Sequence, residues 1–158
     1  MNKTLLTLAF AGVMGPALAL ADSAPARVQE FVDVMVNNHC VLPEKTAAEL
    51  LPAAGFTRDE AQIIVKHLRS EGRMNRAKRT LYLTGAACET PQAIRAGSLQ
   101  VLSRTDCQVA QDAIGDTFAK SGLPVELVTA ALRQMVTDGE ATYADAGQVY
   151  TLNSEICS

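Results

Sequence analysis

The sequence predicts a mainly helical α+β protein with small β-hairpins, built from two tandem copies of one structural unit. Residues 55–72 recur 67 positions later as residues 122–139, and each segment begins with Gly and ends with an acidic residue followed by Gly. The same shift places Cys40 on Cys107. Both segments carry apolar residues at the spacing i, i+3, i+4, i+7, which marks one face of a helix. These residues are Ala61, Ile64, Val65 and Leu68 in the first segment, and Val128, Ala131, Leu132 and Met135 in the second.

The first copy is expected to begin with two helices joined by a short extended link. An amphipathic pattern of Val, Phe and Met predicts a helix over residues 28–36, and residues 40–42 read as the link. The second helix is expected to start near Pro43, since Pro is favoured at the first helical position. It is expected to end near Gly55, since Gly is favoured as a C-terminal cap.

A third helix and a hairpin are expected to complete the first copy. Thr57 and Glu60 have the spacing of a capping box, in which each side chain bonds the other residue's backbone N–H. The helix that starts there is expected to stop at Gly72. Residues 73–84 then predict two short strands.

The second copy is expected to repeat this order of elements. Thr90-Pro91 is a typical helix start, and the turn residues Asp145-Ala146-Gly147 separate two runs with strand character. Helices are predicted over residues 90–102, 108–121 and 124–138, and strands over residues 140–143 and 148–152.

Helix, extended link, helix, tight Gly turn, helix and two-stranded wing: this order resembles the winged-helix fold. The resemblance covers residues 26–88 and 91–157 and rests on the order of the elements. It implies two tandem winged-helix-like repeats, each with three helices and a two-stranded wing, in which the extended link pairs with the final strand of its own wing. We expect the first repeat to occupy residues 22–89 and the second to occupy residues 90–158.

The first 21 residues have the layout of a secretory signal peptide. Lys3 is the only charge before a long apolar run, which closes on the small-x-small pattern Ala19-Leu20-Ala21. A membrane anchor is the alternative, but the apolar stretch is short for a span and ends on a cleavage pattern. We therefore expect residues 1–21 to be removed from an exported protein, periplasmic or secreted, with no transmembrane span in the mature chain.

Four cysteines remain in the mature chain and predict two disulfides formed in an oxidising compartment. They are Cys40, Cys88, Cys107 and Cys157. Four cysteines allow three connectivities, and the sequence by itself does not choose among them. The winged-helix resemblance implies Cys40–Cys88 and Cys107–Cys157, each of which would clip a wing to the helices of its own copy. The alternative pairs, Cys88–Cys107 and Cys40–Cys157, would join the copies.

No motif for catalysis or for binding a cofactor stands out. The chain lacks Cys-x-x-Cys, a Gly-rich phosphate loop and a Gly-x-Ser-x-Gly elbow. An enzyme or metal-dependent protein would have to use His39 beside Cys40, or His67 with Glu71 one helical turn later. We read these groups as surface side chains and a structural disulfide. The sequence therefore predicts a non-catalytic protein with no cofactor.

A basic cluster in the first copy is the candidate functional surface. Between residues 66 and 79 six cations accompany one acid, a local balance of +5: Lys66, Arg69, Arg73, Arg76, Lys78 and Arg79. They fall on the third helix and the wing, where winged-helix proteins contact DNA. Nucleic-acid binding is nevertheless disfavoured, because the protein is expected to be exported and the mature chain, with 13 basic and 17 acidic residues, carries a net charge of −4.

The sequence therefore favours an exported binding or accessory protein. Its basic wing would recognise another envelope protein or an anionic surface. The second copy has acidic residues near its wing and carries Val125 and Val136 where the first copy has arginines, so this face is expected to pack on the first copy or on a partner. Wings of opposite charge also permit head-to-tail self-association.

Overall fold

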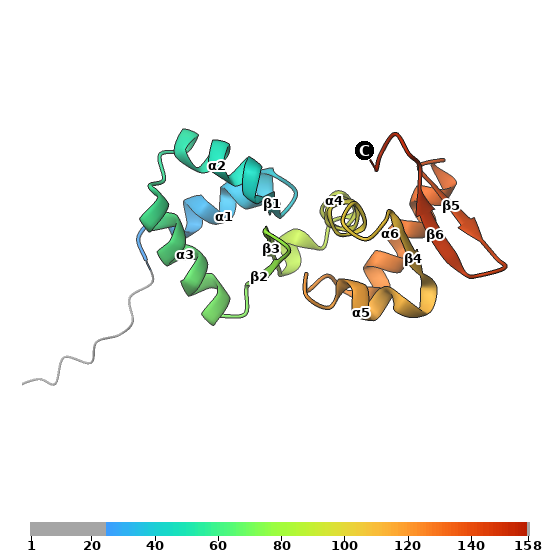
Figure 1. The fold of residues 1–158 in the computed structure, drawn as a ribbon. Coiled ribbons are helices and arrows are strands. Elements are labelled where there is room, and N and C mark those ends of the chain that lie inside the picture. The colour runs from blue at the N-terminus through green and yellow to red at the C-terminus, as the bar shows by residue number, and fades with distance from the viewer. Residues whose placement is uncertain (1–24, 158) are drawn as a thin grey trace, which may run out of the picture.

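The computed structural model describes residues 25–157, so the predicted signal peptide lies outside the described part of the chain. The described chain is a mixed α+β fold with six α-helices and two small antiparallel sheets of three strands each (Figure 1). The first half contains α1 (Val28–Asn37), β1 (Val41–Pro43), α2 (Glu44–Ala53), α3 (Arg58–Ser70), β2 (Met74–Ala77) and β3 (Thr80–Leu83). After the 3₁₀ turn η1 (Ala86–Cys88), the second half contains α4 (Pro91–Leu102), β4 (Gln108–Ala110), the 3₁₀ turn η2 (Gln111–Ala113), α5 (Ile114–Phe118), α6 (Val125–Thr137), β5 (Ala141–Ala144) and β6 (Val149–Leu152).

The predicted start and end of the third helix are confirmed by its capping contacts. The hydroxyl of Thr57 accepts a hydrogen bond from the Glu60 N–H at 3.2 Å, and the Thr57 N–H donates to Glu60 Oε2 at 2.9 Å. Gly72 follows the helix with a φ of 70°, a left-handed conformation that favours Gly. Gly139 stands in the same place after α6 with a φ of 75°.

Each sheet joins the predicted hairpin to the extended link before the second helix. The strand orders are β1-β3-β2 and β4-β6-β5, so the link supplies a third strand to each predicted two-stranded wing. The register across each sheet is equivalent. In the first sheet Leu42 pairs with Leu81 and Leu81 with Arg76, and in the second Val109 pairs with Tyr150 and Tyr150 with Tyr143.

The helix predicted over residues 108–121 is wrong in its first part, where β4 and η2 precede the short helix α5. β4 pairs with β6, and the N–H of Gln111 donates to the Gln148 carbonyl at 2.8 Å. Pairing satisfies the backbone groups of β4 and turns Val109 into the core, where it is buried. These tertiary contacts outweigh the local helix propensity of the segment.

Two pairs of residues that lie 67 positions apart share an unusual backbone conformation in the two halves. His39 and Cys40 have φ values of 55° and 63°, and Asp106 and Cys107 have values of 55° and 61°. In each half the Cys N–H donates to the carbonyl five residues earlier, at 2.7 Å and 3.1 Å. Positive φ is unfavourable for residues with a Cβ, so its occurrence at matched positions marks a turn that both halves share.

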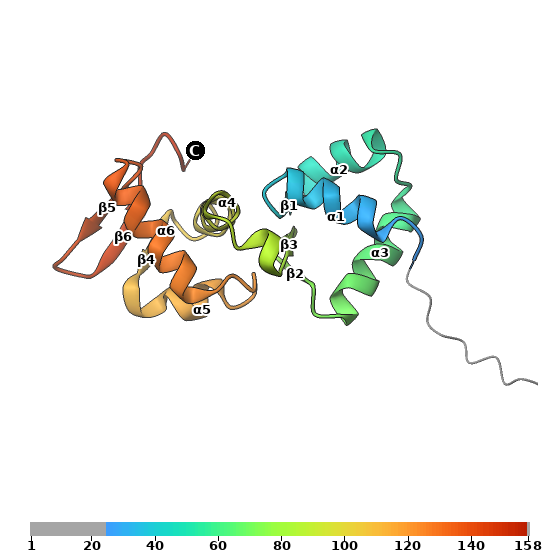
Figure 2. The ribbon, with the colours of Figure 1, turned by 180° about the vertical axis from the view of Figure 1, so that it is seen from behind.

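The first sheet lies between two apolar cores. Leu81 and Leu83 of β3 face the core of the first half, while Tyr82 and Val41 belong to the core of the second half together with residues of α4. Figures 1 and 2 show α4 next to β1 from both sides. Tyr82 is 2% exposed, and its burial raises the pKa of the phenol.

The corresponding face of the second sheet is polar. Gln108 and Thr142 are exposed there, and Thr151, which stands where the first sheet has Tyr82, is half-buried. The first sheet therefore has an apolar core on each face, whereas the second sheet has a core on one face and a polar, partly exposed surface on the other.

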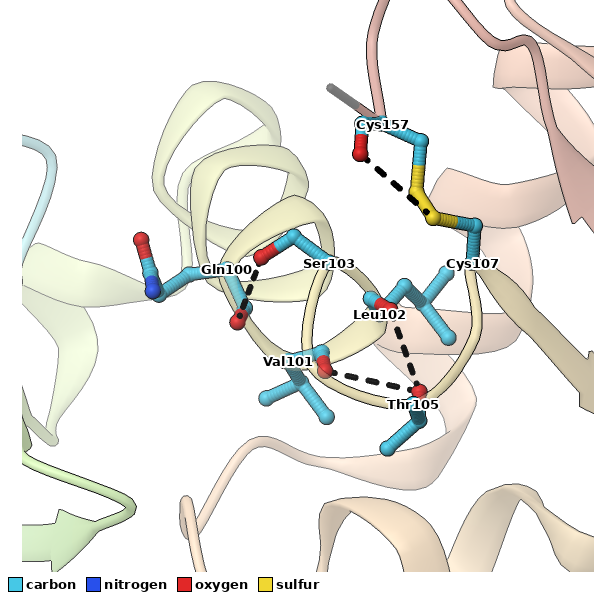
Figure 3. The surroundings of a disulfide bond; sticks show 7 residues. All are labelled: Gln100, Val101, Leu102, Ser103, Thr105, Cys107 and Cys157. Carbon is cyan, nitrogen blue, oxygen red and sulfur yellow. Dashed lines mark hydrogen bonds between the residues drawn. A yellow bond between two sulfur atoms is a disulfide. The ribbon is translucent and has the colours of Figure 1, made fainter.

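The disulfides join Cys40 to Cys88 and Cys107 to Cys157, with Cα–Cα distances of 5.6 Å and 5.9 Å. These are the pairs within each half, and the alternative that joins the halves is not formed. Figure 3 shows Cys157 held beside the end of α4 by Cys107. Two disulfides fit an extracellular or periplasmic location. Within residues 25–157, no helix has the length and apolar character needed to cross a membrane.

Tyr82→Thr is expected to lower the free energy of unfolding by about 3 kcal/mol, because it removes a buried aromatic ring that joins the first sheet to the second core. Urea denaturation followed by circular dichroism measures this loss. The control is Thr151→Ala on the matching face of the second sheet, which should change the free energy by no more than about 0.5 kcal/mol. Equal losses at the two positions would contradict the different roles of the two sheets.

Replacing both cysteines of one disulfide with Ala is expected to destabilise the fold by about 2–5 kcal/mol. The bonds close chain separations of 48 and 50 residues, so both variants should lose a similar amount. Thermal unfolding of the two double variants tests this. A variant as stable as the wild type would show that its disulfide does not restrict the unfolded chain.

Candidate functional site

An open groove of about 940 Å³ lies between α2, α3 and the first sheet. Its floor is apolar and is contributed by all three of these elements. Ala47, Val65 and Leu81 are only half-buried, so apolar surface in the groove stays open to solvent. The floor consists of Leu42, Ala47, Ala48, Leu51, Phe56, Ala61, Val65 and Leu81.

The rim of the groove is basic. Five exposed cations line it: Arg58, Lys66, Arg69, Arg76 and Arg79. Among the described residues that line the groove, Glu44 is the single acid, and its carboxylate lies 3.6 Å from Arg79 Nε. The surplus of positive charge favours an acidic ligand.

Four of the six predicted basic residues line this groove, namely Lys66, Arg69, Arg76 and Arg79. Arg58 also lines the groove but was not predicted, because it lies outside the run of residues 66–79. Its position on the stripe of α3 that includes Lys66 and Arg69, eight and eleven residues later, is the signal that identifies it.

The other two predicted residues have different surroundings. Arg73 precedes β2, and its guanidinium lies 3.2 Å from the carboxylate of Glu71. Lys78 reaches the second half, where Nζ donates to the Arg104 carbonyl at 2.9 Å, and the Arg104 side chain donates to the Lys78 carbonyl. Lys78 therefore links the halves.

Aromatic side chains fill the equivalent region of the second half. Tyr150 stands where the first half has Leu81 and is 3% exposed, and Tyr143 stands where the first half has Arg76. The two rings pack with centroids 4.7 Å apart, and the Tyr143 hydroxyl donates to Gln111 Oε1 at 2.9 Å. The same framework is thus open and basic in one half and closed in the other.

The carboxylates of Glu60 in the first half and Glu140 in the second half both form hydrogen bonds near these surfaces. Hydrogen bonds from the backbone and side chain of Thr57, at one end of the groove, lower the pKa of Glu60. In the second half Arg95 Nε donates to Glu140 Oε2 at 2.9 Å, and this bond raises the pKa of Arg95. Glu140, one of the acidic residues near the hairpin of the second half, is therefore paired with a cation.

The two histidines lie apart from the groove. His67 Nε2 is 3.3 Å from Glu71 Oε1, and His39 is exposed in the turn before β1. Among the described residues, no group of three or more His, Cys, Asp or Glu side chains is arranged to hold a metal ion. All four cysteines are in disulfides.

A second, smaller hollow of about 430 Å³ lies between α4 and α6. Leu127, Ala130 and Ala131 contribute apolar surface, while Arg95 and Asp138 contribute opposite charges. This mixture gives it no preference for a ligand of one charge, so the larger groove is the candidate site.

Compared with known proteins, the chain matches no protein-family model, no curated protein and no solved structure. The candidate site therefore rests on the geometry of the groove and on the contrast between the two halves of this chain.

Glu60→Gln is expected to weaken the dependence of stability on acidic pH. Because folding lowers the pKa of Glu60 below its ordinary value of 4.5, the carboxylate stabilises the fold above that pH and loses this effect as pH falls through the lowered value. The loss in free energy of unfolding between about pH 6 and about pH 3 should be smaller in Glu60→Gln than in wild type. Asp145→Asn removes one carboxylate at an exposed turn position and is the matched control. An equal loss in Glu60→Gln and in wild type would contradict the prediction.

Proposed function

We propose that this protein is an exported, non-catalytic binding or accessory protein that recognises an acidic segment of another envelope protein through the groove of its first half. The observation that carries the proposal is the open apolar groove with five cations on its rim. Apolar surface that stays accessible on a folded protein is typical of an interaction site. The basic rim supplies charge complementarity to an acidic partner.

We interpret the two halves as tandem winged-helix-like repeats that have diverged in role. Each half has a helix, a link strand, two further helices, a hairpin and one disulfide, in the same order. In this interpretation the first repeat binds the partner. The second repeat supports it, since α4 shares a core with the outer face of the first sheet.

Nucleic acid is a less suitable ligand than an acidic protein segment. Phosphate backbones are bound by cations, whereas the floor of this groove is apolar. The solvent-facing side of α3 carries Asp59 and Ile63, the latter 57% exposed, in place of further cations. An anionic membrane surface and a second copy of this chain remain outcomes that the experiments below distinguish.

The triple variant Arg69→Glu, Arg76→Glu, Arg79→Glu is expected to lose the partner, because it reverses the charge of the rim. The matched control, Arg73→Glu, Lys120→Glu, Arg133→Glu, makes the same change in net charge at exposed positions that do not line the groove. A photo-crosslinking amino acid at Gln62, which lines the groove, would be introduced into wild type and both variants in producing cells.

A crosslinked envelope protein is expected with wild type and with the control. Its yield should fall at least about tenfold with the groove variant, as expected for the loss of about 1.4 kcal/mol of binding free energy. The same crosslinked proteins at equal yield in all three would show that the rim is not the contact surface. A crosslink to a second copy of this chain would instead identify self-association.

A further inference from the structure

Two helical stripes, one along α2 and one along α3, line the groove. The lining residues of α3 begin at Arg58 and continue at positions i+3, i+4, i+7, i+8 and i+11, ending near Arg69. Those of α2 begin at Glu44 and follow the same spacing to Pro52. Because α3 has 13 residues, the groove is about 20 Å long, which matches three to four turns of another helix.

Small side chains from both helices line the groove. Ala47 and Ala48 come from α2, and Ala61 and Val65 come from α3. Such residues let a partner backbone approach closely and accept larger apolar side chains from it. Leu81 of the first sheet closes the bottom of this channel.

The cations are distributed along the groove and do not gather at one end. Arg58 and Arg69 are eleven residues apart on α3, or about 16 Å, with Lys66 between them. Arg76 and Arg79 come from the hairpin. A ligand that uses all of them must carry negative charge along its length.

We infer that the occupant of the groove is an amphipathic α-helix of a partner protein, with apolar residues on one face and Asp or Glu on both flanks of that face. This inference rests on the proposed function and specifies its ligand. An amphipathic helix meets a groove of this kind with side chains at positions i, i+3, i+4 and i+7. Its acidic residues would lie against Lys66 and Arg69 of α3 and against Arg76 and Arg79 of the hairpin.

Two other ligand forms fit less well. A fatty acid or single lipid has one anionic end, whereas the cations here extend over most of the length of α3. An extended peptide gains affinity by adding backbone hydrogen bonds to a sheet edge. The backbone groups of α2 and α3 are already paired within each helix, so the helices offer no such ladder. The edge strand β2 contributes only Arg76 to the lining of the groove.

The second half supplies the design of a blocking variant. Arg76→Tyr with Leu81→Tyr places in the first half the tyrosines that close the second, a pair this framework already accommodates. The matched control, Arg133→Tyr with Ala144→Tyr, makes the same change in charge and adds two rings at exposed positions of the second half. Ala48→Trp, at an exposed position in the groove, is a second blocking variant if the tyrosine pair unfolds the protein.

The probes are two libraries of displayed peptides, each long enough to form three to four helical turns. Apolar residues are fixed at positions i, i+4, i+7 and i+11, and all other positions are varied. In one library the segments are free to form a helix, and in the other a central Pro-Gly prevents it. Selection on wild-type mature protein should enrich clones with acidic flanks from the first library alone. Their affinity should fall at least about tenfold for the blocking variant and stay unchanged for the control.

Enrichment of the interrupted library, enrichment without acidic flanks, or no enrichment from either library would overturn the helix inference. So would binding of wild type to phosphatidylglycerol vesicles that is lost in the blocking variant, because it would identify a lipid surface as the occupant. A different result would contradict the proposed function: unchanged crosslinks to envelope proteins after the charges of Arg69, Arg76 and Arg79 are reversed to Glu.

Discussion

The alternation of side chains along β3 is the constraint on which the arrangement of the two halves depends. In a strand, neighbouring residues face opposite sides of the sheet. Leu81 and Leu83 therefore enter the first core while Tyr82, between them, enters the second. One short strand thus contributes to both cores, so α4 packs against one face of the first sheet. The groove lies on the other face of that sheet.

The same framework gives two different surfaces because a few side chains differ. Leu81 and Arg76 leave a channel between the hairpin and α3, whereas Tyr150 and Tyr143 close the matching region of the second half. A backbone stabilised by a sheet, a disulfide and a buried helix face tolerates such changes at its open side. The difference between the two surfaces therefore depends on the size and charge of the side chains at these positions.

Much of the fold could be predicted from local signals. The capping box at Thr57, the Pro91 helix start and the Gly stops are chemical features of single turns, and the structure places helix ends within a residue or two of them. The candidate site was predicted in part. Lys66 and Arg69 could be placed together by helical spacing, but whether Arg73 and Lys78 share their surface depends on where the hairpin lies relative to α3 and α4.

The sequence by itself determined the order of the elements, the recurrence of one pattern after 67 residues and the presence of cysteines able to form a bond in each half, because these depend on periodicity and local chemistry. Only the tertiary structure decided that residues 108–110 form a strand, that the first sheet has a core on each face, and that apolar residues from α2, α3 and β3 form an open floor. These features depend on contacts between segments far apart in the chain. Their free energy comes from burial and pairing, which no single segment encodes.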